Sequence, residues 1–283
     1  MSYNASRTLP FRIEFMRQVR RRRTLWSYVY VIALPVLVSL ASKFGSNQSS
    51  DNGRNSFGGG SMDLVGLAGH GAANFTATML YFATGFVLVT VVAMFCGDTV
   101  ASDASWATLR YLLAAPVPRT RLLKQKFSVS LLLSLFAVLL LPVASYLIGG
   151  LAFGWAPLQS PLGPTFGTWD SIWRLALMSG YVFVSLLFVA GLAFFMGTRT
   201  DAPLGAVSAA VIITIISNIM DAIGSLGNAR QWLPTHFFYA WLDALSPTID
   251  WTAMLRGASY SLIVFALCCT ATALLFGRKD IVS

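Results

Sequence analysis

Six uncharged, strongly apolar stretches dominate this chain of 283 residues. Each is close to the roughly twenty residues that an α-helix needs to cross the hydrocarbon core of a bilayer. Because lipid offers no hydrogen-bond partner to the backbone, all six are predicted to be transmembrane helices. The predicted fold is an all-α polytopic membrane protein, with residues 1–283 as a single transmembrane domain. The stretches run from about Leu25 to Ala41, Thr76 to Cys96, Phe127 to Phe153, Leu175 to Gly197, Leu204 to Ile223 and Ala258 to Phe276.

The distribution of charge predicts how these spans are oriented. Six spans place both termini on one side of the membrane, and fifteen of the twenty Lys and Arg residues fall on that side. By the positive-inside rule, both termini are expected to be cytoplasmic in a plasma membrane, most simply a bacterial inner membrane. The net charge of +9 is then explained by topology and by attraction to anionic lipid headgroups. A nucleic-acid partner is not expected.

Residues suited to catalysis are scarce. The chain has three cysteines, two histidines and a single glutamate, Glu14, and none of them falls in a metal-binding spacing. The motifs of serine hydrolases and zinc proteases, Gly-x-Ser-x-Gly and His-Glu-x-x-His, are missing from the sequence. We therefore expect no catalytic residue, no metal site and no cofactor bound by this chain.

Residues 1–23 are basic and precede the first span. Phe11, Phe15 and Val19 recur every four residues, which predicts a helix that lies in the membrane interface with this stripe facing the lipid. A solvated basic arm is the alternative. The basic stretch followed by an apolar run also imitates a signal peptide, but its length and the late Pro35 favour an uncleaved span.

The extracytoplasmic segment 227–254 is unusually aromatic. Trp232, Phe237, Phe238 and Trp241 lie within it, as expected of residues that sit at the membrane surface. We expect the segment to contact the membrane, either as a short re-entrant helix or as an interfacial helix that only anchors. His236, a lone histidine among aromatic residues, is interpreted as a packing residue.

The cytoplasmic connection 98–126 carries the most specific pattern. Its apolar residues recur at helical spacing until Pro116 ends the run, which predicts a short amphipathic helix across the cytoplasmic face. Such a helix suits either a groove on a soluble partner or the lipid headgroups. The apolar positions are Leu109, Leu112 and Leu113, and the flanking basic positions are Arg110, Arg119 and Arg121.

This connection resembles the cytoplasmic motif of the type-2 permease subunits of ATP-binding-cassette (ABC) exporters. The departures from that motif are Asp103 in place of the usual Glu and Ala107 in place of the usual Gly. The closing residues Phe276–Ile281 and the basic N-terminal helix also resemble that family, whose corresponding helix is called the elbow helix. The positions that match the motif are Asp103, Thr108, Leu112, Leu113, Pro116, Arg119 and Lys126.

The resemblance implies a half-transporter in which two permease subunits form the export pathway, as a homodimer or a heterodimer. Separate ATPase subunits, which carry ATP and Mg²⁺, would drive it, and this chain has no phosphate-binding loop of its own. The family's coupling helix fits a cleft of the ATPase. The residues implied at that interface are Asp103, Thr108, Leu109, Arg110, Leu112, Leu113, Pro116 and Arg119.

The fifth span carries a stripe of polar residues at helical spacing. Since polar groups avoid lipid, the stripe is expected to line the pathway or the dimer seam, or to form hydrogen bonds within one subunit. The strongly apolar spans, which carry few charges, favour an amphipathic or lipid-like substrate, such as a drug, peptide antibiotic, lipid or glycan. The competing interpretation is an integral-membrane assembly or immunity factor that transports nothing. The stripe consists of Ser208, Thr214, Ser217, Asn218 and Asp221.

Overall fold

The computed structural model describes residues 11–45, 64–105, 119–161, 163, 165–200 and 202–278. Within these ranges the chain is helical, apart from turns and one isolated antiparallel bridge between Gln159 and Thr165. This confirms the predicted all-α fold. The helices are α1 (Phe11–Val19), α2 (Arg22–Gly45), α3 (Leu64–Leu67), η2 (Ala68–His70), α4 (Ala72–Phe82), η3 (Ala83–Val87), α5 (Leu88–Ser105), α7 (Arg119–Phe153), α8 (Thr168–Arg199), α9 (Pro203–Ala222), η4 (Gly224–Trp232), η5 (Ala240–Leu245) and α10 (Trp251–Arg278).

Six segments of the described chain are long and apolar enough to cross a membrane, in agreement with the six predicted spans. The second span is built from α4, η3 and α5 in succession. Several bounds were predicted too short: α7 begins at Arg119 rather than near Phe127, and α10 at Trp251 rather than near Ala258. Hydropathy detects the part of a helix that suits hydrocarbon, whereas the backbone stays helical into the headgroup region.

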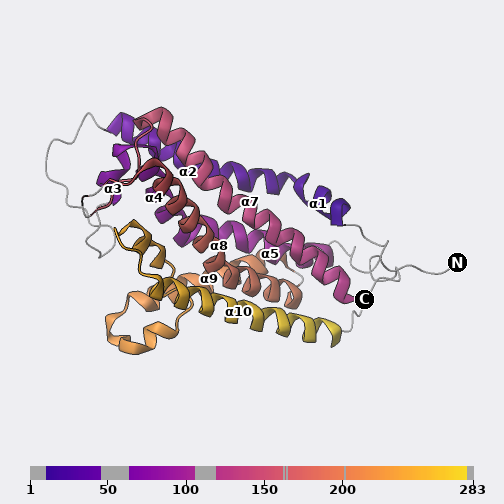
Figure 1. Cartoon of the computed structure of the whole chain (residues 1–283). Coiled ribbons are helices and arrows are strands. Elements are labelled where there is room, and N and C mark those ends of the chain that lie inside the picture. The colour runs from indigo at the N-terminus through magenta and orange to yellow at the C-terminus, as the bar shows by residue number, and fades with distance from the viewer. Residues whose placement is uncertain are drawn as a thin grey trace.

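The helices form an elongated bundle with α5 and α8 in its interior (Figure 1). α10 packs mainly on α8, α2 packs mainly on α7, and α9 packs on both α5 and α8. As a result α2, α9 and α10 expose large apolar side chains along their length. Such faces suit contact with lipid or with another apolar protein surface.

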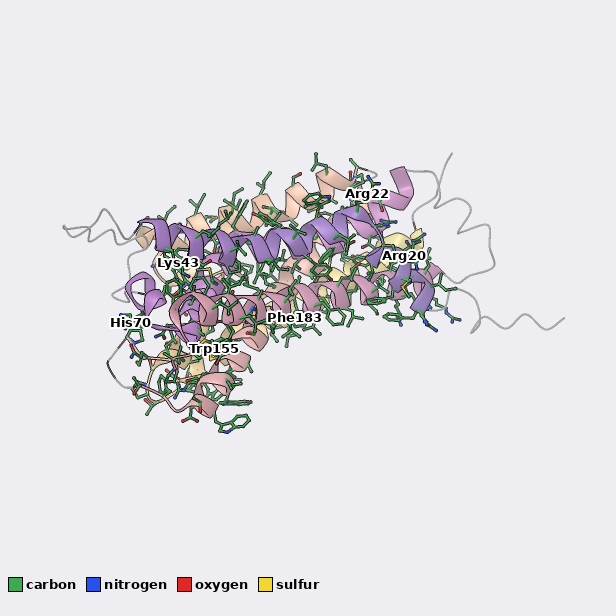
Figure 2. The ribbon with its side chains drawn as sticks, turned by 90° about the horizontal axis from the view of Figure 1, so that it is seen from above. Arg20, Arg22, Lys43, His70, Trp155 and Phe183 are labelled. Atoms are coloured by element: carbon green, nitrogen blue, oxygen red, sulfur yellow. The ribbon has the colours of Figure 1, made fainter. Side chains whose placement is uncertain are left out.

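Both ends of the described chain lie at one end of the bundle. α1 and the last turn of α10 are found there in Figure 1, as are the end of α5 and the start of α7. Figure 2 shows Arg20 and Arg22 at this end and Lys43, His70 and Trp155 at the opposite one. We call the first the terminal end and the second the far end.

The two interior helices cross at glycines. A Cβ atom on Gly197 of α8 would collide with the carbonyl oxygen of Gly97 on α5. A Cβ atom on Gly97 would lie 3.3 Å from the carbonyl oxygen of Ala193. Small residues are the usual means by which membrane helices approach backbone to backbone. The crossing of α5 and α8 therefore depends on these side chains being absent.

The far-end segment between α9 and α10 differs from its prediction. In place of one re-entrant or interfacial helix it consists of η4, a series of turns and η5. Gly227 has a positive φ of 52°, and Pro234 follows shortly after it, so a continuous α-helix is broken. Phe238 and Trp241 are fully buried, so the segment packs onto the bundle rather than lying apart from it.

Contacts to the bundle hold that segment in place. The Tyr181 hydroxyl donates a hydrogen bond to the Phe237 carbonyl at 2.6 Å. Arg174 donates to the carbonyls of Ala244 and Ser246, and its guanidinium lies over the ring of Phe166. Both donors belong to α8, so the interior helix organises the far-end surface.

Candidate functional site

The predicted coupling helix lies outside the described residues. What the structure describes is the two helices on either side of it, α5 and α7. Asp103 belongs to the last turns of α5, and Arg119 is the first residue of α7. The predicted interface residues outside the described ranges are Thr108, Leu109, Arg110, Leu112, Leu113 and Pro116.

Both ends of the predicted connection 98–126 are helical. Residues 98–105 continue α5 and residues 119–126 begin α7, so only residues 106–118 of the predicted range 98–126 lie outside the described helices. Asp98 and Lys126 are therefore helical residues held at fixed positions near the terminal end. Both are buried, with 4% and 2% of their surface exposed.

Lys126 faces a carboxylate from the first helix of the chain. Its Nζ lies 3.5 Å from Oε1 of Glu14, which is itself 3% exposed. The same Glu14 oxygen accepts hydrogen bonds from Arg17 at 2.8 Å and from Gln18 at 3.1 Å. Burial raises the pKa of Glu14, but Lys126, Gln18 and Arg17 together outweigh it and hold that pKa below its ordinary value. The carboxylate is therefore charged at neutral pH.

Asp98 pairs with the break between α1 and α2. Its Oδ2 forms an ion pair with Arg23 and lies 3.5 Å from Nη1 of Arg21. The same Arg21 nitrogen donates to the Ser102 hydroxyl at 3.2 Å, one turn further along α5. The break itself is closed by the Thr24 hydroxyl, which donates to the Gln18 carbonyl at 2.7 Å. The other carboxylate oxygen of Asp98, Oδ1, is buried and has no hydrogen-bond partner among the described residues.

These ion pairs form two neighbouring groups at the terminal end, one around Glu14 and one around Asp98, which together we call the basal cluster. It ties α1 and the start of α2 both to the end of α5 and to the start of α7. Buried charges are costly unless paired, so each pair fixes the geometry of the helices that carry it. The basal cluster consists of Glu14, Arg17, Arg21, Arg23, Asp98 and Lys126.

α5 and α7 are also joined directly by hydroxyl groups. The Thr99 and Ser130 side-chain oxygens lie 2.5 Å apart, and Cys96 lies 3.9 Å from the Ser134 hydroxyl. Hydroxyl contacts of this kind stabilise helix pairs in lipid. The two helices that enter and leave residues 106–118 are thus bound to each other as well as to the first helix.

The helix predicted before the first span is present as α1, separate from α2. The apolar stripe expected to face the lipid is divided, because Phe15 and Val19 pack against the hydrophobic core and only Phe11 is exposed. Phe11 is largely exposed and stacks on Phe15, while the fully buried positions are the polar residues Glu14 and Gln18. The available signal was the single glutamate of the chain, placed among arginines next to a membrane span.

The polar stripe of α9 is divided among different surroundings. Ser217 is buried and its hydroxyl lies 2.7 Å from that of Thr235. Thr214 is buried and donates to the Ala210 carbonyl of its own helix, and Ser208 bonds to the Gly205 carbonyl in the same way. Asn218 is half-buried. Towards the end of α9, the stripe therefore contacts the far-end segment through Ser217 and Thr235.

Asp221, the last member of the stripe, meets two basic residues of the far-end segment. Its Oδ1 lies 2.5 Å from Nδ1 of His236 and 3.5 Å from Nε of Arg230. His236 also contacts the Phe237 ring edge-on, so it packs as interpreted but has a polar partner that the sequence did not indicate. These contacts tie the end of α9 to the segment that follows it.

Six helices long and apolar enough to cross a membrane, in an all-helical bundle, define a polytopic membrane protein. The chain belongs to the DUF2705 family, described as proteins of unknown function, whose family model matches residues 56–282. None of the curated proteins compared with the chain matches it. Within the described residues, no group of three or more His, Cys, Asp or Glu side chains is arranged to hold a metal ion.

Proposed function

We propose that this protein is the membrane-spanning permease subunit of an ABC exporter. Two permease subunits would form the pathway, and separate ATPase subunits would bind residues 106–118 from the cytoplasm. The terminal end is the cytoplasmic end in this proposal, in keeping with its excess of basic residues. The substrate class is an amphipathic or lipid-like molecule.

The basal cluster is the observation that carries the proposal. A short connection can move whole helices only if the helices on both sides of it are held firmly at their bases. Glu14–Lys126 and Asp98–Arg23 supply such attachments, one on each side of residues 106–118. The resemblance of residues 103–126 to the type-2 permease motif supplies the partner.

The arrangement suggests how movement would be transmitted. A displacement of residues 106–118 by the ATPase would reach α5 and α7 together, because Thr99 and Ser130 join them. It would also reach α1 and α2 through the buried ion pairs. In this proposal Leu109, Leu112 and Leu113 form the apolar ridge in the ATPase cleft, and Arg110 and Arg119 make polar contacts beside it.

In this proposal the substrate passes along the polar face of α9, together with the same face of α9 in the second permease subunit. Ser208, Asn218 and Asp221 are the partly exposed members of the polar stripe and would line this route, whereas Thr214 and Ser217 are buried within the subunit. This half of the proposal rests on the polarity of the stripe within a span.

The test is purification of the tagged protein from its native host in mild detergent, with identification of stoichiometric partners and an ATPase assay. The variant Leu112→Asp/Arg119→Glu places charge on the expected ridge and reverses the flanking one. Arg54→Glu, in the connection expected on the opposite side of the membrane, is the charge-reversal control.

Co-purification of an ATPase that the double variant releases and Arg54→Glu retains would support the proposal. Recovery of the protein without an ATPase, or retention of the partner by the double variant, would overturn it. The first of these outcomes would favour the assembly or immunity factor, which needs no energy source.

A further inference from the structure

A cleft opens at the terminal end between α7 and α10. It forms because α10 packs on α8 while α7 packs on α2, α4 and α5, so the two helices diverge. The cleft has a volume of about 430 Å³, within the range of about 300–1,000 Å³ that is usual for ligand sites. Its lining residues are Leu123, Lys124, Phe127, Phe194, Cys269 and Ala273.

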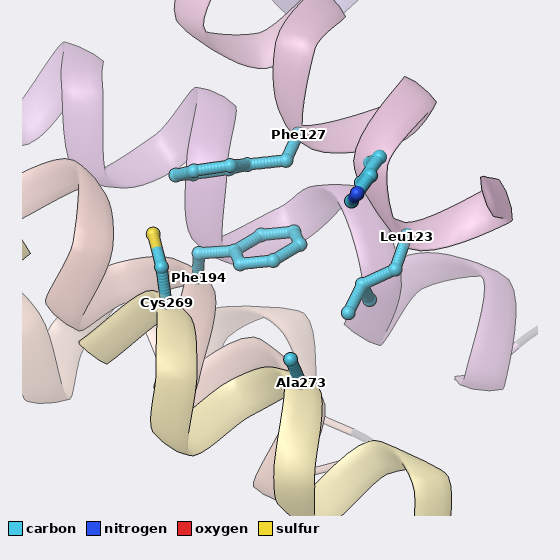
Figure 3. Close-up of a pocket in the computed structure, with 6 residues that line it drawn as sticks. Leu123, Phe127, Phe194, Cys269 and Ala273 are labelled. Atoms are coloured by element: carbon cyan, nitrogen blue, oxygen red, sulfur yellow. The ribbon is translucent and has the colours of Figure 1, made fainter. Parts of the chain in front are cut away.

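The interior of the cleft is aromatic and aliphatic. The rings of Phe127 and Phe194 are stacked with their centroids 4.1 Å apart, and Phe265 continues the stack at 5.7 Å from Phe127. Figure 3 shows Phe127 above Phe194, with Leu123 on one side, Cys269 of α10 on the other and Ala273 of α10 below. These walls suit a hydrocarbon chain.

One charged residue, Lys124, lines the cleft. It is exposed, and none of the described residues forms a hydrogen bond or an ion pair with it. Arg121 lies three residues earlier, on the same side of α7, and adds a second positive charge nearby. The lining contains no carboxylate. A cation beside an apolar cleft is complementary to a ligand that has a hydrocarbon tail and an anionic head.

We propose that this cleft binds an anionic phospholipid from the membrane leaflet at the terminal end. One acyl chain would occupy the cleft between α7 and α10, and the headgroup phosphate would bind Lys124. The surrounding bilayer supplies this ligand, because the cleft lies between α7 and α10, two helices that are long and apolar enough to span a membrane. The proposal does not depend on the transport function.

The experiment is photo-crosslinking of the full chain in phosphatidylcholine nanodiscs. Two probes carry the same diazirine-bearing acyl chain, one on phosphatidylglycerol and one on phosphatidylcholine, and labelled peptides are mapped by mass spectrometry. We expect the phosphatidylglycerol probe to label the peptides around Phe127 and Ala273 about five-fold more than the phosphatidylcholine probe, the factor expected for one lysine near an anionic headgroup.

Two variants with matched controls separate the charge from the cleft. Lys124→Gln should reduce the ratio between the probes to about one, whereas Arg22→Gln, at another exposed cation of the terminal end, should leave it unchanged. Ala273→Trp should fill the cleft and abolish labelling of its walls by both probes. Ala266→Trp, at an exposed position of the same helix outside the cleft, should not.

Equal labelling by the two probes would overturn the proposal, since it would indicate ordinary contact with the surrounding lipid. So would a preference for phosphatidylglycerol that survives Lys124→Gln. Absence of labelling at the walls of the cleft by both probes would also overturn it, since lipid would then not enter the cleft. Size-exclusion profiles of all variants establish that each one folds.

Discussion

At the scale of single residues, the stability of the terminal end depends on charges that the membrane environment makes expensive. Glu14 and Lys126 are almost fully buried and face each other, so removing either one takes an opposite charge away from a buried group. Arg17 contacts the same carboxylate but is half-exposed to solvent, where an ion pair contributes little. The two pairs of Glu14 are therefore unequal.

Replacing Glu14 tests this inequality. Glu14→Gln should lower the free energy of unfolding by about 3 kcal/mol, because Lys126 loses the negative charge it faces. Arg17→Gln should lower it by no more than about 1 kcal/mol. The measurement is unfolding by SDS in mixed micelles, monitored by tryptophan fluorescence.

The double variant Glu14→Gln/Lys126→Met is the control for that prediction. It removes both charges and retains an apolar chain of similar volume, so most of the lost stability should return. If it is as unstable as Glu14→Gln, then the stability at this position comes from the other hydrogen bonds of Glu14 and not from Lys126.

At the scale of helices, glycines determine how closely two helices can approach. α5 and α8 cross where Gly97 and Gly197 bring backbone against backbone. The second span also contains a single turn of π-helix, η3, whose Gly85 lies under the hydroxyl of Tyr239. Such turns insert one residue into a helix and change which neighbours its two halves meet.

The helix crossing predicts a position-specific effect of a small substitution. Gly197→Ala should destabilise the protein by about 1–3 kcal/mol, because the added methyl group would force α5 away from α8. Gly180→Ala lies on the same helix and meets no atom within 4 Å, so it should be neutral or slightly stabilising. Equal effects in the SDS titration would contradict the crossing described above.

The π-turn predicts coupling between two distant residues. An alanine Cβ at Gly85 would lie 2.6 Å from the Tyr239 hydroxyl oxygen but 3.9 Å from the next atom of that ring. Gly85→Ala should therefore cost about 1 kcal/mol alone and much less in a Tyr239→Phe background. A double-mutant cycle in the same titration measures the coupling, and simple additivity would place Tyr239 away from the π-turn.

The elements differ in how well the sequence predicts them. The six spans follow from the length and hydropathy of the apolar stretches, which report local composition. Pairing between Glu14 and Lys126 depends on two residues far apart in the chain, and no periodicity reveals it. The turns around Phe238 and Trp241 escape prediction as well, because their aromatic residues follow no helical period and are buried by tertiary packing.

At the scale of the whole molecule, the two ends of the bundle are chemically distinct. The terminal end holds the basal cluster and residues on either side of the connection 106–118, while the far end holds the segment anchored by Arg174 and Tyr181. The proposed orientation, with the terminal end in the cytoplasm, follows from the excess of basic residues there.

Cysteine labelling tests that orientation. In a background with Cys96, Cys268 and Cys269 replaced by serine, Arg22→Cys and His70→Cys place thiols at exposed positions of opposite ends. A membrane-impermeant maleimide applied to intact cells should label His70→Cys, and should label Arg22→Cys only after permeabilisation. The reverse pattern would invert the proposed orientation and remove residues 106–118 from the reach of a cytoplasmic ATPase.

The pair between Glu14 and Lys126 also sets an order of events during biosynthesis. Residues 11–45 leave the ribosome long before residue 126 is made, so α1 and α2 are inserted while Glu14 still lacks the cation across the bundle. The same delay holds for Arg23, which meets Asp98 only when the second span is complete. The first helix of the chain is thus fixed in place only once the third span has begun to enter the membrane.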